Sequence, residues 1–192
     1  MSVILGYQTK DKIIIAGDRR ACNANGAVIS EEQQKVHQIN KHLCFASAGR
    51  AFMEKVINDK AIKMETDKLC IEDIDKIVSD FYLNAKDKDI SLIYMLPSYL
   101  IVAGLNRKGE SGIYAIIHNA GKEDKKYVPM LIFNPADMTN RDCALIMGNN
   151  IKRYGLSFVK NTIKDISEKS IWVNDKYNVW TFDKKSNEGF LT

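Results

Sequence analysis

The second residue of the chain, Ser2, combines a hydroxyl group with a place beside the N-terminus. If Met1 is removed, Ser2 also carries the free α-amine, and such an amine ordinarily has a pKa of roughly 7.7–8.0. The amine can then take the hydroxyl proton near neutral pH without a histidine, while the oxygen attacks a carbonyl carbon. Methionine is usually excised before a residue as small as serine. These two residues therefore predict an N-terminal serine nucleophile.

A carboxylate follows a buried segment in the same stretch. The continuous apolar run over residues 13–17 is typical of a strand buried on both faces. Asp18, Arg19 and Arg20 come directly after it, and a charge beside a core is costly unless it is paired or functional. Taken alone, Asp18 is most simply a strand-end charge that pairs with Arg20. A role beside Ser2 is the alternative.

Sequence motifs for other chemistries are absent from the chain. It contains no GxGxxG, P-loop, GxSxG, HExxH or EF-hand pattern. The three histidines have no triad or metal-ligand spacing, and the four cysteines include no CxxC pair. We therefore expect neither a metal nor a cofactor, and free thiols in a reducing compartment.

Composition restricts the possible partners and location. The 192 residues suit one domain over residues 1–192, with 45% hydrophobic and 27% charged residues. The net charge of +4 is spread along the chain, so we expect no nucleic-acid binding. No apolar run approaches the length of a membrane span, and no signal-peptide pattern opens the chain. A cytoplasmic protein without a membrane partner is the expectation.

Apolar periodicity predicts two hairpins followed by two helices. The expected strands are residues 2–8, 13–17, 28–30, 35–39 and 43–48. The period of apolar residues then becomes helical, first from Phe52 to about Met64 and again over about 71–85.

Further strands are expected at residues 99–103, 112–117, 127–133 and 143–147, with a polar loop at 119–126. A third helix should run from Gly148 to about Ile163, and a last hairpin should pair residues 171–173 with 177–182. Because strands and helices do not alternate one by one, this order favours an α+β fold in which helix pairs cover two antiparallel sheets.

The segment from Ser2 to about Arg50 resembles β-type subunits of the proteasome and the related bacterial HslV peptidase, which are N-terminal nucleophile (Ntn) hydrolases. The shared features, in order and at similar spacing, are the first hydroxyl, Gly6, Lys10-Asp11, Asp18-Arg19-Arg20, Lys35 and Phe45-Ala-Ser-Ala-Gly49. The resemblance implies a four-layer αββα sandwich of two antiparallel sheets. Since one helix is predicted before the last hairpin, one family helix near the C-terminus should be missing.

The resemblance implies catalytic roles for those residues of this chain that occupy the family's catalytic positions. Ser2 corresponds to the nucleophile, although the family usually has threonine there. Asp18 would hold Lys35, and Lys35 would favour the ionised hydroxyl electrostatically. Gly49 would supply a backbone N–H to the oxyanion that develops in the transition state. Without the resemblance, Lys35 reads as a solvated strand lysine and Gly49 as an ordinary strand-to-helix glycine.

Other family positions surround this set. Asn149, in Gly148-Asn149, falls where the family has a Gly-Ser turn near the amine, and a helix N-cap is an equally good interpretation. Arg20 matches a residue that supports the site, and Cys22 matches a position whose backbone pairs with the substrate. Ala21, Ser47 and Ala51 would lie near the pocket for the substrate side chain that precedes the cut bond. The family's C-terminal catalytic Asp and Ser have no clear counterpart, and Ser170 is a poor substitute.

The expected function is hydrolysis of peptide or amide bonds in peptide or protein substrates, by a homo-oligomer that could form a ring, with any ATPase partner left open. A non-catalytic scaffold or assembly subunit with Met1 retained is the alternative. An amidase for a small metabolite would share the mechanism and differ only in its pocket.

Overall fold

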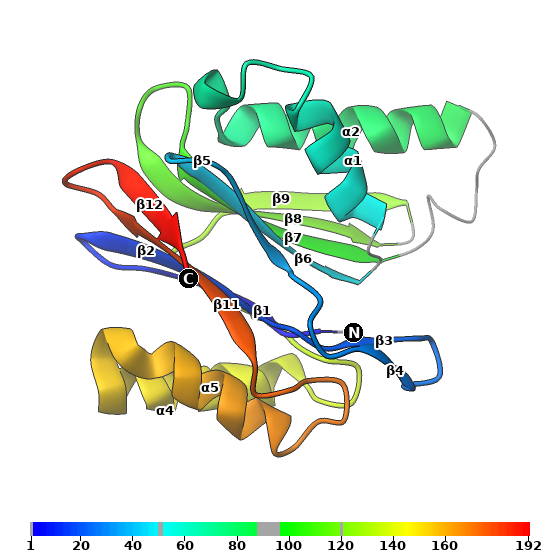
Figure 1. The fold of residues 1–192 in the computed structure, drawn as a ribbon, viewed down its shortest axis with the longest axis vertical. Helices are drawn as coiled ribbons and strands as arrows, with labels where there is room; N and C mark the ends of the chain where they lie inside the picture. Colours follow the sequence, from blue (N-terminus) through cyan, green and yellow to red (C-terminus); the bar gives the residue numbers. More distant parts are fainter. Residues whose placement is uncertain (1, 50–51, 88–96, 120) are drawn as a thin grey trace.

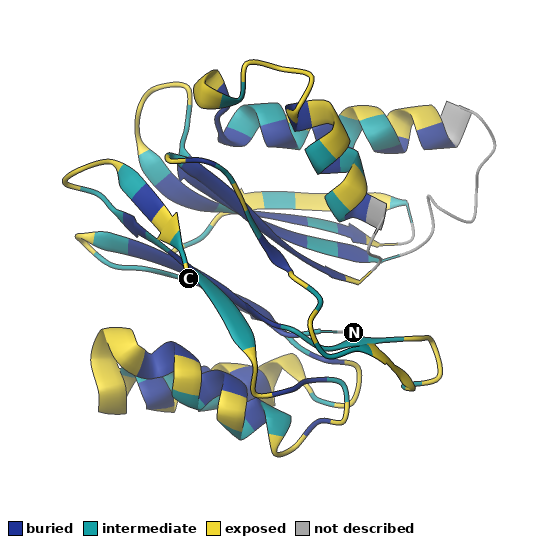
Figure 2. Ribbon diagram, viewed as in Figure 1, coloured by how far each residue is buried: buried dark blue, intermediate teal, exposed yellow. Residues whose placement is uncertain are grey.

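The computed structural model describes residues 2–49, 52–87, 97–119 and 121–192. Two five-stranded antiparallel sheets pack face to face, and a pair of helices covers the outer surface of each (Figure 1). The α+β class and the four-layer αββα sandwich are therefore confirmed. Burial follows the layers, since the sheets are mostly buried while the outward helix faces are exposed (Figure 2). No helix in the described ranges is both long and apolar enough to cross a bilayer.

The first sheet carries the N-terminal hairpin at its centre. Its strands, in spatial order, are β10 (Met130–Phe133), β1 (Ile4–Gln8), β2 (Lys12–Asp18), β11 (Tyr177–Asp183) and β12 (Glu188–Leu191). Alternate residues of β2 face opposite sides of this sheet: Ile13 and Ile15 lie between the sheets, whereas Ile14 and Ala16 pack against the helices. This double burial explains why the strand is apolar from Ile13 to Gly17, between its charged ends.

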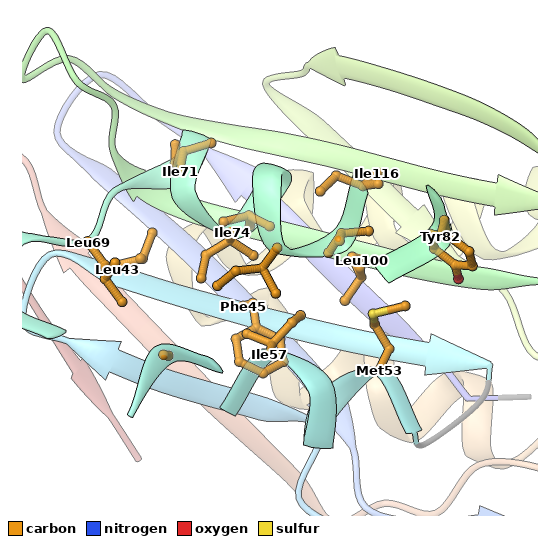
Figure 3. Close-up of a cluster of buried hydrophobic side chains, with 14 residues drawn as sticks. Leu43, Phe45, Met53, Ile57, Leu69, Ile71, Ile74, Tyr82, Leu100 and Ile116 are labelled. Carbon is orange, nitrogen blue, oxygen red and sulfur yellow. The ribbon is translucent and has the colours of Figure 1, made fainter. Parts of the chain in front are cut away.

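The second sheet is a meander covered by the first helix pair. Its strands are β5 (Val36–Asn40), β6 (Leu43–Gly49), β7 (Ser98–Leu105), β8 (Ser111–Asn119) and β9 (Lys122–Tyr127). Above it lie α1 (Phe52–Ala61), the short helix η1 (Thr66–Lys68) and α2 (Ile71–Asp87). Phe45 and Leu100 of the sheet pack against Met53, Ile57 and Ile74 of the helices (Figure 3).

The region after β10 differs from the sequence prediction. The expected strand at 143–147 is wrong, because these residues belong to α4 (Asn140–Tyr154). Cys143, Met147 and Asn150 are buried at helical spacing. The side chain of Thr139 caps this helix by accepting a hydrogen bond from the backbone N–H of Asp142 at 3.1 Å.

A second helix follows in the same layer, so one long third helix over 148–163 is also wrong. The chain turns through η2 (Gly155–Ser157) into α5 (Phe158–Ser167), which packs beside α4 (Figure 1). Gly155 at φ +56° allows the break between them. The helix that we expected to be missing near the C-terminus is therefore present as α5.

Two strand predictions also need correction. Residues 122–127 form the edge strand β9 rather than a loop, because its backbone pairs with β8 while its charged side chains face solvent. The last hairpin joins β11 to β12, not residues 171–173 to 177–182. A separate small hairpin, β3 (Ala21–Cys22) with β4 (Val28–Ser30), projects from the end of the sandwich (Figure 1).

Candidate active site

A cavity of about 610 Å³ opens where the β3–β4 hairpin, the end of β6 and the start of α1 meet. Its wall includes most of the residues that the sequence analysis singled out for chemistry or substrate binding. These are Ser2, Ala21, Cys22, Lys35, Ser47 and Gly49. Four separate chain segments, among them β3 of the small hairpin and β6 of the second sheet, thus converge on one concave surface.

Asp18 lies directly behind this wall and is fully buried. Its Oδ1 accepts hydrogen bonds from the Lys35 ammonium at 2.7 Å and from the backbone N–H of Val3 at 3.0 Å. Its Oδ2 accepts from the backbone N–H of Arg20 at 2.9 Å. The same carboxylate therefore fixes Lys35 and the backbone immediately after Ser2, which keeps both elements in register at the cavity.

Burial and pairing act in opposite directions on this ion pair. Burial lowers the pKa of Lys35 below its usual value of 10.5, and the neighbouring carboxylate of Asp18 counteracts part of that effect. Burial likewise raises the pKa of Asp18, against the effect of Lys35 and the two backbone donors. Lys35 also donates to the carbonyl oxygen of Arg20, so two acceptors orient its ammonium.

Gly49 ends β6 with a backbone that only glycine adopts readily. Its φ is +99°, and a Cβ atom at this position would lie 2.7 Å from the carbonyl oxygen of Pro97. Gly49 and Pro97 both line the cavity. Close backbone approach and positive φ together explain why this position holds glycine.

The structure places Arg20 outside the cavity wall. Its Nε donates to Glu31 at 3.1 Å, and its Nη1 donates to the carbonyl oxygen of Ile171 at 2.8 Å. Trp172, the next residue, does line the cavity. Arg20 therefore supports the site indirectly, by holding the segment that carries Trp172.

The expectation for Asn149 is wrong. Asn149 is exposed near the middle of α4, and Gly148 beside it lies within the same helix, so neither residue forms a strand-to-helix turn. The turn between β10 and α4 spans residues 134–139, and its Ala136 lines the cavity. The apolar residues before Gly148 suggested a strand because a short apolar run fits either element. Ala51 lies outside the described residues.

Sequence reasoning missed several residues of the wall. Glu54 lies on the first turn of α1, and as a charged residue of a helix it would be expected to face solvent. Its side chain is only 12% exposed, however, and lines the cavity. The other missed residues are Asn23, Ala24, Ile29, Gln33, Pro97, Ala136 and Trp172. No motif marks them, because they reach the cavity from five separate places in the chain.

A hydrogen bond between Ser170 and Asp137 positions two of these residues, Ala136 and Trp172. Ser170 is buried, and its hydroxyl donates to Oδ1 of Asp137 at 2.6 Å. The Ser170 oxygen also accepts from the backbone N–H of Trp172 at 3.1 Å. Because Asp137 follows Ala136, this pair ties together the two segments that bring Ala136 and Trp172 to the cavity. Ser170 therefore has a structural role through its hydrogen bond to Asp137, a residue that the sequence analysis did not single out.

The residue types at the cavity suit acyl transfer by a hydroxyl group. Ser2 supplies the hydroxyl, and Lys35 supplies a fixed positive charge on the same wall. Within the described ranges, no group of three or more His, Cys, Asp and Glu side chains is placed to hold a metal ion.

Comparison with known proteins agrees with this arrangement. A family model described as "Proteasome subunit" matches residues 2–62, the stretch that contains Ser2, Asp18, Lys35 and Gly49. No curated protein matches the chain. The family match and the four-layer sandwich together bear out the resemblance of this chain to the β-type subunits of the proteasome.

Proposed function

We propose that this protein hydrolyses peptide bonds, with Ser2 as the nucleophile once Met1 has been removed. One observation carries the proposal: Ser2, Lys35 and Gly49 line one cavity, and buried Asp18 binds both Lys35 and the backbone next to Ser2. An isolated strand-end carboxylate or a solvated lysine would not need this arrangement.

The first half of the reaction forms an acyl-enzyme. The α-amine of Ser2 takes the proton from its own hydroxyl as Oγ bonds to the substrate carbonyl carbon. The Lys35 ammonium stabilises the negative charge on Oγ, and the Gly49 N–H donates to the oxyanion. The C–N bond of the substrate then breaks, and the departing amine receives the proton held by the α-ammonium group.

The second half releases the acyl group and restores Ser2. The free α-amine takes a proton from water while the water oxygen bonds to the ester carbonyl carbon. The ester C–O bond breaks, and Oγ of Ser2 recovers that proton. Each cycle thus consumes one peptide bond and one water molecule, with no cofactor in the balance.

The proposal is tested by labelling with a β-lactone. Intact mass first identifies protein that has lost one methionine, and peptide mapping then locates the label. Met-free protein should be acylated at Ser2, while Ser2→Ala and protein that retains Met1 should stay unmodified. Failure of Met-free protein to react at Ser2 would overturn the proposal and favour a non-catalytic scaffold subunit.

We also propose that the protein assembles into a homo-oligomer and that its substrates are peptides rather than small amides. Similarity to proteasome subunits supports a cytoplasmic homo-oligomer, and native mass spectrometry will give the number of copies. A peptidase should cleave peptide amides faster than single amino-acid amides of the same acyl residue. The opposite order would indicate an amidase for small molecules.

A further inference from the structure

Three buried polar side chains meet between α2 and one end of the second sheet. Tyr82 of α2, Ser98 of β7 and His118 of β8 are each at most 2% exposed, and Figure 3 shows Tyr82 beside the apolar core. The hydroxyl oxygens of Tyr82 and Ser98 are 2.5 Å apart, and either of them could be the donor. The ring of His118 lies flat against the ring of Tyr82, with centroids 3.5 Å apart. Tyr82 is therefore held both by its ring face and by its hydroxyl.

The hydroxyl pair lies on a face of the sheet that is largely apolar. Leu100 and Val102 of the same strand belong to the core under α1 and α2. A buried polar group costs free energy unless it is hydrogen-bonded. Phenylalanine and alanine would fill the space of Tyr82 and Ser98 without that cost. The hydrogen bond thus does more than fill the core, since it fixes α2 to one point on β7.

That point on β7 lies directly opposite Gly49. Antiparallel pairing of β6 with β7 places Gly49 across from Ser98. A Cβ atom on Gly49 would lie 3.4 Å from Cα of Ser98 and 2.7 Å from the carbonyl oxygen of Pro97. Pro97 and Gly49 both line the candidate active site. The Tyr82 hydroxyl therefore holds the backbone against which Gly49 is packed.

We propose that Tyr82 is a positioning residue that keeps the Gly49 N–H aimed at the developing oxyanion. The proposal rests on the peptidase function proposed above and adds to it a residue outside the described wall of the cavity. Hydrogen-bond donors stabilise a transition state only when they are aligned in advance, and small displacements are costly. The connection runs from the Tyr82 hydroxyl through Ser98 and the pairing of β7 with β6.

The kinetic test removes the two hydroxyl groups one at a time. Tyr82→Phe keeps the ring and its stacking on His118, and it should lower kcat for peptide cleavage roughly 10- to 100-fold. KM should change little, because the Gly49 N–H acts in the transition state rather than in substrate binding. Ser98→Ala should have the same effect. The double variant should be no slower than either single variant, because both hydroxyls act through one hydrogen bond.

The matched control is Tyr114→Phe, which removes a tyrosine hydroxyl from the same layer. Tyr114 of β8 packs against the same core, and strand pairing places it opposite Val102, farther along β7 than Ser98. This variant should keep its kcat. An equal loss of kcat in Tyr114→Phe, an unchanged kcat in Tyr82→Phe, or independent effects of the Tyr82 and Ser98 substitutions would overturn the proposal.

Hydrogen–deuterium exchange separates this proposal from the proposed function, because it requires no activity. Mass spectrometry follows the peptic peptides that contain Gly49. Their exchange should be roughly 3- to 10-fold faster in Tyr82→Phe, as the loss of one hydrogen bond implies, and unchanged in Tyr114→Phe. That result supports the positioning of Gly49 even if Ser2 proves not to be a nucleophile. Unchanged exchange in Tyr82→Phe overturns it even if the protein cleaves peptides.

Discussion

Lys35 and Asp18 join the two sheets of the sandwich directly behind the wall of the cavity. Asp18 ends β2 in one sheet, Lys35 immediately precedes β5 in the other, and their side chains meet at 2.7 Å with exposures of 0% and 5%. One ion pair therefore links the N-terminal hairpin that carries Ser2 to the sheet that carries Gly49. Stability and catalysis should both depend on it.

A double-mutant cycle measures this dependence. Asp18→Asn should lower the free energy of unfolding by about 3–5 kcal/mol, because it leaves the Lys35 ammonium buried without its counter-charge. Lys35→Met should also destabilise, by leaving the Asp18 carboxylate with only its backbone donors. The double variant should be more stable than the sum of the two single effects implies, as measured by urea unfolding. Additive losses would show that the two groups are energetically independent.

The rate should depend on pH through two groups. The α-amine must be uncharged, so kcat/KM should rise as pH approaches roughly 8. Lys35 must be charged, so the rate should fall again at alkaline pH, when Lys35 loses its proton. Because burial lowers the pKa of Lys35, this fall should begin at a lower pH than the 10.5 at which an ordinary lysine titrates. A pH profile of peptide cleavage or of β-lactone labelling tests both limbs. A rate that stays constant up to pH 10.5 would contradict the assigned role of Lys35.

Gly49→Ala should lower stability and abolish labelling of Ser2. The new methyl group would lie 2.7 Å from the Pro97 carbonyl oxygen, and the backbone would have to keep a φ of +99°, which alanine rarely adopts. The matched control is Gly109→Ala, where φ is +78° and a Cβ would meet nothing within 4 Å. That variant should lose about 1–2 kcal/mol and keep full labelling. Equal thermal destabilisation of the two variants would argue against the close contact at Gly49.

Residues 148 and 149 should behave as helix residues distant from the site. Gly148→Ala should stabilise the protein by about 0.5–1 kcal/mol, because alanine favours a helix interior and a Cβ there meets nothing within 4 Å. Asn149→Ala should leave β-lactone labelling unchanged, since Asn149 is exposed on α4. Slower labelling of Asn149→Ala would support a catalytic role for Asn149 despite its position within α4.

Sequence patterns predicted the parts of the fold that local periodicity controls. The N-terminal hairpin, β6, and the helices at α1 and α2 follow from alternating, continuous or helical apolar spacing. Between residues 143 and 163 the same reasoning failed. A five-residue apolar run fits a strand or a helix, and only packing of α4 and α5 on the first sheet selects the helix. Charged β9 was missed because backbone pairing, not side-chain pattern, defines an edge strand.

For the site, the sequence by itself predicted Ser2, Asp18, Lys35 and Gly49, because the order and spacing of rare features along one stretch carry a family resemblance. Only the tertiary structure decided which other side chains share their cavity. Glu54 lines the cavity although its charge suggests a solvent-exposed helix face. Asn149 does not line the cavity, because its segment forms a helix rather than a strand-to-helix turn. Convergence of distant segments depends on how sheets and helices pack, and a linear pattern does not contain that information.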